Sequence, residues 1–110
     1  MEELLKNADE FLESAKENLK KKRFNASVSD FFKAIVILCD YLIYKEIKAV
    51  PKNHNDRFSL LRIHFPEIYR KVSSLFSVYT DSYNLRLGEK EAKTLQEYAN
   101  GIRKYVNDKK

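Results

Sequence analysis

One stretch, from Ser27 to Ala49, carries apolar residues on nearly every side of a helix. It reads SVSDFFKAIVILCDYLIYKEIKA, and its apolar residues recur at helical spacing and also fill the positions in between. A helix that is apolar all round is covered by neighbours on several faces. Its apolar part is interrupted by Lys33 and Asp40 and is too short to span a membrane. The stretch therefore predicts a buried central helix around which the rest of the chain packs.

The remaining segments each show a single apolar stripe. Helices are predicted from Glu2 to Lys22, from Arg57 to His64, from Pro66 to about Tyr83, and from Glu89 to Val106. Only two Gly and two Pro occur, which favours long helices joined by short connections. Short connections place consecutive helices antiparallel. The fold class predicted for residues 1–110 is therefore one all-α domain: an up-down four-helix bundle with one short additional helix.

The helix ends are predicted from residues that favour caps. Asn25 or Ser27 is suited to cap the central helix, and Ser27 with Asp30 three residues later resembles a capping box. Asp56 is suited to cap the short helix. Gly88 suits the left-handed position just past a helix end.

Composition limits the function classes. The 110 residues include 21 basic and 16 acidic side chains, a net charge of +5. The two signs are interleaved, which favours a solvated charged surface over a nucleic-acid footprint. The single cysteine, Cys39, excludes an internal disulfide and sits in the most apolar segment. The N-terminus shows no signal-peptide pattern, so the predicted location is the cytoplasm, and no membrane partner is expected.

The candidates for chemistry are few. With two histidines, one cysteine and no Gly-rich phosphate loop, neither a metal nor a cofactor is expected. Arg57 and His64 are seven residues apart, so a continuous helix places them on one face. An arginine that stabilises phosphate charge and a histidine that moves a proton would make them a candidate catalytic pair of a ribonuclease. The alternative is two surface residues on a short helix, and His54 is most simply a polar turn residue.

The tyrosines late in the chain also need an explanation. Tyr79, Tyr83, Tyr98 and Tyr105 are suited to stack on bases, to pack at the rim of the core, or to form a dimer contact. They are many for one small core to enclose, and aromatic residues are enriched at interfaces. We therefore expect a homodimer whose interface draws on the last two long helices.

The order of these features resembles a HEPN domain over nearly the whole chain. An opening amphipathic helix is followed by the FFKAIVILCDYL helix, a Lys-containing turn with His54, a helix that runs into Tyr83 and Arg86, and a last helix that begins with Glu91 and Ala92. The resemblance implies a four-helix bundle, commonly homodimeric. It also implies either a partner of a small nucleotidyltransferase in a toxin–antitoxin pair or a metal-independent ribonuclease.

The resemblance also implies where an active site would lie. Ribonuclease members carry an Arg followed, after four to six residues, by a His, between the last two long helices. Here Arg86 holds that place, but residues 87–93 contain no histidine, whereas Arg57 and His64 have the spacing at the wrong place in the topology.

Because no histidine follows Arg86 at the expected spacing, the sequence leaves three functions open. The first is a non-catalytic binding or regulatory HEPN protein that binds nucleotide or RNA or partners a nucleotidyltransferase, with Arg86, Tyr83 and His54 as ligand-binding candidates. The second is a HEPN-type ribonuclease that uses Arg57 and His64, or Arg86. The third is a structural bundle for protein interaction.

Overall fold

The computed structural model describes residues 1–110, which form five helices and no strand. In chain order the helices are α1 (Glu2–Lys20), α2 (Phe24–Ile47), α3 (His54–His64), α4 (Pro66–Asp81) and α5 (Glu89–Lys109). None of them combines the length and the apolar character that crossing a membrane requires.

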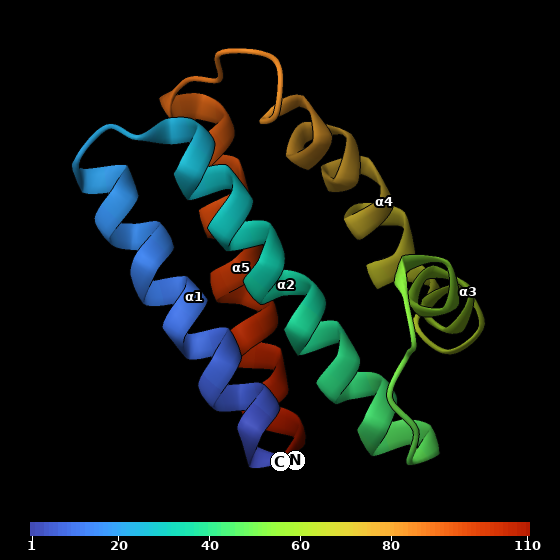
Figure 1. The fold of residues 1–110 in the computed structure, drawn as a ribbon. Coiled ribbons are helices and arrows are strands. Elements are labelled where there is room, and N and C mark those ends of the chain that lie inside the picture. Colours follow the sequence, from blue (N-terminus) through green and yellow to red (C-terminus); the bar gives the residue numbers. More distant parts are fainter.

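The predicted central helix is α2, and it is the most buried element of the molecule. It supplies 13 of the 26 buried residues. The helices α1, α4 and α5 pack on different sides of it, and α3 lies against its C-terminal half (Figure 1). Burial of apolar surface is the main favourable term in folding, so the apolar circumference of α2 holds the bundle together.

The four long helices alternate in direction. In Figure 1 α1 rises from the N-terminus, α2 descends, α4 rises, and α5 descends to a C-terminus beside the N-terminus. The short helix α3 is seen end-on in the same view, so it crosses the long helices at a steep angle. The predicted all-α bundle with one short additional helix is confirmed.

The predicted caps of α2 are wrong. The helix begins at Phe24, so Asn25 and Ser27 lie inside it and neither caps it. The Ser27 hydroxyl instead donates to the backbone carbonyl of Ala15 in α1, at 2.9 Å. Asp30, predicted to complete a capping box, accepts hydrogen bonds from two polar side chains of α1. These side chains therefore join two helices, a use that local spacing does not reveal.

The predictions for the start of α3 and for the role of Gly88 are also wrong, whereas α5 begins at Glu89 as predicted. His54 is the first residue of α3 rather than part of a turn, and the cap is Asn53, whose side chain accepts from the backbone N–H of Asp56 at 2.9 Å. Gly88 has φ −113°, outside the left-handed region, and it precedes α5 as its N-cap. The Gly88 N–H donates to the Glu91 carboxylate at 2.7 Å, so Gly88 belongs to the helix that follows it.

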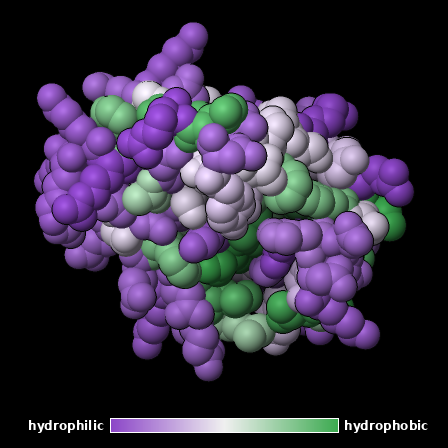
Figure 2. Space-filling view, turned by 45° about the horizontal axis from the view of Figure 1, so that its top comes forward, coloured by the Kyte–Doolittle hydropathy of each residue, from purple (hydrophilic) through white to green (hydrophobic).

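Hydrophobic and hydrophilic residues separate clearly on the surface. In Figure 2, which tilts the upper end of Figure 1 toward the viewer, hydrophilic residues dominate the rim and hydrophobic residues gather in the middle of the visible face. Asp40 is the one charged residue of the chain that is buried. A buried charge requires a partner, and that partner lies on α3.

Candidate functional site

The buried carboxylate of Asp40 on α2 is paired with Arg57 of α3. Arg57 Nε donates to Asp40 Oδ1 at 2.6 Å, and Nη2 donates to Oδ2 at 2.9 Å, which makes a bidentate ion pair. The side chains of Arg57 and Asp40 are only 12% and 9% exposed. Burial lowers the pKa of Arg57, but the hydrogen bond and the charge of Asp40 outweigh it and raise that pKa overall. The pair therefore fixes α3 on α2 and keeps Arg57 charged.

His54 completes this cluster from the first turn of α3. Arg57 Nη1 lies 2.7 Å from His54 Nδ1. A guanidinium can only donate, so Nδ1 accepts and the imidazole proton lies on Nε2. Burial, and then the charge of Arg57, lower the pKa of His54, although Asp40 opposes them. The cluster therefore favours a neutral His54.

The candidate catalytic pair is not brought together. Seven residues correspond to about 10 Å along a helix axis, and His64 is exposed at the end of α3. Arg57 points instead at Asp40 and His54, and its three nitrogens each have a partner there. Both residues lie on one helix, as the spacing predicts, but they do not converge on a common site.

Arg86 and Tyr83 lie on the connection between α4 and α5. Asn25 of α2 holds this connection: its side-chain amide donates to the carbonyl of Ser82 at 2.9 Å and to that of Leu85 at 2.6 Å. Arg86 is exposed and belongs to none of the ion pairs of the molecule. Its guanidinium is therefore free to meet an anion from outside the chain.

A row of aromatic rings links His54 to Tyr83. The ring centroids of His54 and Phe76 are 5.7 Å apart, those of Phe76 and Tyr79 6.1 Å, and those of Tyr79 and Tyr83 5.5 Å. The hydroxyls of Tyr79 and Tyr83 share a hydrogen bond of 2.7 Å. Burial, and then this hydrogen bond, raise the pKa of Tyr79 to about 12. His54 and Tyr83 thus stand at opposite ends of one row, and Arg86 follows Tyr83 by three residues.

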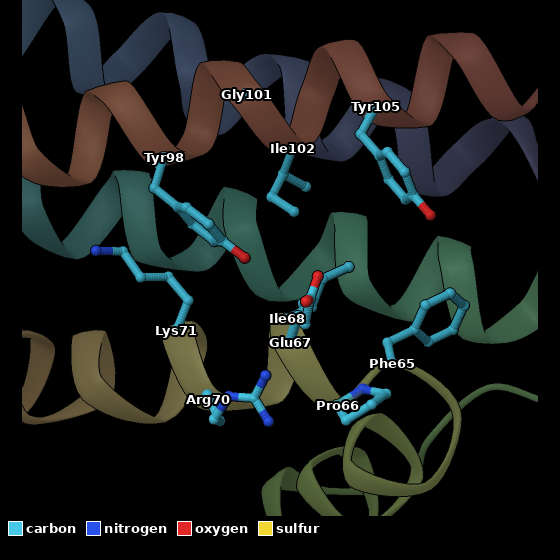
Figure 3. Close-up of a pocket in the computed structure, with 10 residues that line it drawn as sticks. All are labelled: Phe65, Pro66, Glu67, Ile68, Arg70, Lys71, Tyr98, Gly101, Ile102 and Tyr105. Atoms are coloured by element: carbon cyan, nitrogen blue, oxygen red, sulfur yellow. The ribbon is translucent and has the colours of Figure 1, made fainter.

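A second feature is a groove of about 850 Å³ between α4 and α5. Figure 3 shows Tyr98, Ile102 and Tyr105 pointing from α5 toward α4, with Lys71 and Phe65 on the opposite wall and α2 behind. Both α4 and α5 pack on α2 and scarcely contact each other, which leaves this space open. The groove is apolar and aromatic at its centre and charged along the α4 side.

The four late tyrosines therefore lie on two surfaces. Tyr98 and Tyr105 line the groove, whereas Tyr79 and Tyr83 form the hydrogen-bonded pair at the end of α4. Tyr79 also stacks on the buried ring of Phe32, with centroids 4.6 Å apart. The last two long helices thus offer two separate sets of aromatic contacts.

Cys39 is unsuited to act as a nucleophile, and no group of side chains is arranged to hold a metal ion. Burial raises the pKa of Cys39 to about 12, so its thiol stays protonated. No three His, Cys, Asp or Glu side chains are grouped closely enough to hold a metal ion.

The family comparison agrees with this architecture. Residues 1–109 match the family described as HEPN domain, which is nearly the whole chain. The chain belongs to the HEPN family. No curated protein and no solved structure shows a significant match to it.

Within this HEPN domain, sequence reasoning missed the partner of Arg57. Asp40 is a charged residue in the most apolar stretch of the chain, and such a residue signals a buried partner. Nothing in the sequence marks Arg70, Lys71 and Phe65 as residues that line a groove, because the groove depends on how α4 and α5 diverge. Gly101 did carry a signal, since glycine in the middle of a helix is unfavourable.

Proposed function

We propose that this HEPN domain acts as a binding or regulatory protein and does not cleave RNA. The state of Arg57 carries this proposal. A catalytic arginine must reach the charge that develops on the phosphate, and its guanidinium is already bound by Asp40 and His54. A buried arginine that leaves its carboxylate strands that charge in a poorly hydrated site, which costs several kcal/mol.

The composition around Arg86 supports the same proposal. Arg86 is exposed and unpaired, but residues 87–93 contain no histidine to serve as acid or base. A general base has to come within hydrogen-bond reach of the proton that it removes. This leaves Arg86 suited to bind an anion and without a partner in its own segment for proton transfer.

Incubation with labelled single-stranded RNA tests the proposal. We expect no cleavage above a protein-free blank, because neither arginine has a histidine beside it that is free to act. His64→Ala and Arg86→Ala are suitable variants, since both side chains are exposed and their loss leaves the core intact. RNA cleavage by the natural protein that disappears in either variant would contradict a non-catalytic role.

The proposal includes a homodimer that forms through the α4–α5 connection. Tyr83 is 71% exposed and Leu85 is 54% exposed, two large apolar side chains on one short segment. A two-fold axis at this segment would bury both residues from both copies. It would also place two copies of Arg86 near each other, where they form a basic cleft for an anionic ligand.

Two classes of partner follow from membership of the HEPN family: a small nucleotidyltransferase, and a nucleotide or RNA. Purification from the native source distinguishes them. A retained protein with nucleotidyltransferase activity supports the first class. Retained ultraviolet-absorbing nucleotide or RNA, lost in Arg86→Ala, supports the second and makes Arg86 the anion contact.

A further inference from the structure

The α4–α5 groove continues along α5 beyond its main volume. A smaller hollow of about 150 Å³ shares Phe65 and Tyr105 with it and adds Lys45, Glu46 and Lys109 to its lining. From Tyr98 to Lys109 the wall of α5 covers about three helical turns, or about 16 Å. The space therefore matches a short helix that lies along α5.

Gly101 lies on this wall, between Tyr98 and Tyr105, in the middle of α5. A Cβ atom added to Gly101 would meet no atom within 4 Å, so packing within the chain does not require a glycine there. Glycine inside a helix is less favourable than alanine by roughly 1 kcal/mol. Its presence is explained if the backbone of another molecule approaches α5 closely at this point.

The charges along the groove are mostly positive. Four basic side chains line it and its extension against two acidic ones: Lys45, Arg70, Lys71 and Lys109 against Glu46 and Glu67. None of these six residues forms an ion pair within the molecule. An occupant with carboxylates on its flanks would find partners on this rim.

The tyrosine rings of the groove are already partly covered. Lys71 Nζ lies 5.9 Å from the centroid of the Tyr98 ring, and Lys109 Nζ lies 5.3 Å from that of Tyr105. A base that stacked on the lysine-covered face of either ring would have to displace that lysine. Half of the residues that line the main groove are hydrophobic, which suits an apolar side of a helix better than a phosphate backbone.

We propose that the α4–α5 groove binds an acidic amphipathic helix of another protein, with its apolar stripe on Ile68, Tyr98 and Tyr105 and its carboxylates at Arg70 and Lys71. This is the helix-in-groove mode of recognition. The inference deepens the proposed binding function by naming a partner chemistry, and it uses a surface separate from the α4–α5 connection.

A second copy of this chain does not fit the groove as well. Its acid-rich helix is α1, with six acidic residues against three lysines. The apolar stripe of α1 is already buried in its own bundle. A second groove placed face to face would oppose like charges. The occupant is therefore a helix from a different protein.

Fluorescence anisotropy with a synthetic probe tests the inference. The probe is a labelled, helix-stabilised peptide of about three turns with leucine at every third or fourth position and glutamate on the flanks. A matched peptide carries lysine in place of each glutamate. We expect the glutamate peptide to bind about tenfold more tightly than the lysine peptide, because the rim is basic.

Variants at Gly101 separate binding from folding. Gly101→Leu should weaken binding of the glutamate peptide about tenfold or more, because the side chain fills the place of closest approach. Gly101→Ala adds one methyl group at the same place and should weaken binding by a smaller factor than Gly101→Leu. Arg70→Glu combined with Lys71→Glu should reverse the preference between the two peptides. Circular dichroism of each variant checks that the helices remain.

Three results would overturn the inference. They are equal binding of the two peptides, unchanged binding by the folded Gly101→Leu variant, and labelled single-stranded RNA that occupies the groove and is lost in that variant. RNA cleavage and dimer mass are read separately, and Gly101 lies outside the α4–α5 connection. A failed peptide test therefore leaves the non-catalytic and dimeric proposals unaffected. RNA cleavage or a monomeric mass would in turn leave the helix-binding proposal unaffected.

Discussion

Gly101 is the residue at which a substitution should stabilise the fold and weaken the proposed binding of a helix. Nothing within the chain occupies the space of a Cβ atom there, and the residue is exposed in the middle of α5. Gly101→Ala should therefore raise the free energy of unfolding by about 0.5–1 kcal/mol, because the unfolded chain loses flexibility and alanine favours the helix. Urea denaturation at a fixed pH measures the change.

Gly88 provides the matched control for that substitution. It precedes α5 as its N-cap, and its added Cβ atom would lie 3.3 Å from Glu91 Oε1. Alanine is a poor N-cap, so Gly88→Ala should lower stability, by up to about 1 kcal/mol. A loss of stability in Gly101→Ala as well would show that α5 makes a contact that requires the glycine.

Arg57 should matter for stability more than any exposed arginine. Arg57→Ala leaves the buried carboxylate of Asp40 without its partner, which should cost about 3–5 kcal/mol. Arg62→Ala, on the exposed side of the same helix, should change stability by less than about 0.5 kcal/mol. Replacing Asp40 and Arg57 together with leucine should cost less than Arg57→Ala alone, because no charge is then stranded. Equal losses in Arg57→Ala and Arg62→Ala would contradict a buried ion pair.

Sequence reasoning reached part of this cluster. Asp40 was visible as a charge in an apolar helix, and Arg57 was visible as a candidate for chemistry. Their pairing was not visible, because the two residues are 17 positions apart and meet only when α3 folds back on α2. Helical spacing correctly placed Arg57 and His64 on one helix. It gave no information on the neighbouring helix α2, which carries Asp40.

At the scale of elements, α3 depends on its first turn. His54 accepts from Arg57 and stacks near Phe58 and Phe76, with Asp40 of α2 as the other charged group in the cluster. A proton on Nδ1 would remove the acceptor and set a second cation beside Arg57. We therefore expect acid to loosen the attachment of α3 to α2.

The sign of the pH effect follows from the lowered pKa of His54. In the unfolded chain the histidine pKa is about 6.5, so as pH falls through that value the unfolded state takes up its proton first. Stability should be full above about pH 6.5 and should fall as the pH approaches the lower folded value. His54→Gln, which keeps an acceptor, should show a smaller loss between about pH 7.5 and about pH 5.

Urea denaturation at the two pH values measures this effect, and His64→Gln is the matched control. His64 lies exposed at the far end of the same helix and outside the cluster. The control should lose as much stability as the natural protein. An equal pH dependence in all three proteins would rule out His54 as its source.

Element boundaries could be predicted where packing sets them and could not where single side chains set them. Apolar periodicity placed α1, α2, α4 and α5 within a few residues, because each helix buries one stripe. The caps failed because Ser27 and Asp30 bond to α1 rather than to their own backbone. A hydrogen bond between helices has no local sequence signal.

At the scale of the whole molecule, the direction of each long helix followed from short connections, but the spaces between the helices did not. The α4–α5 groove exists because both helices pack on α2 and diverge from each other. The four late tyrosines can be read directly from the sequence, but the surfaces on which they lie cannot. Only the packed bundle separates Tyr98 and Tyr105, which line the groove, from the pair that Tyr79 forms at the end of α4 with Tyr83 of the connection.

The position of Tyr83 on the α4–α5 connection defines the surface through which we expect the dimer to form. Tyr83 and Leu85 are exposed together on the α4–α5 connection, which Asn25 holds against α2. A segment held in this way loses little conformational entropy when it binds, which favours association. A two-fold axis buries every contact twice, so one unfavourable substitution acts twice as well.

Light scattering at micromolar concentration measures the result. The natural protein should have the mass of two chains, and Leu85→Glu should reduce it to one, because two carboxylates would meet near the axis. Ile63→Glu is the matched control: Ile63 is 68% exposed on α3, away from the connection, so its variant should remain a dimer. A natural protein with the mass of one chain would exclude the dimer at these concentrations. A Leu85→Glu variant that stays dimeric would move the interface away from Arg86 and remove the shared basic cleft.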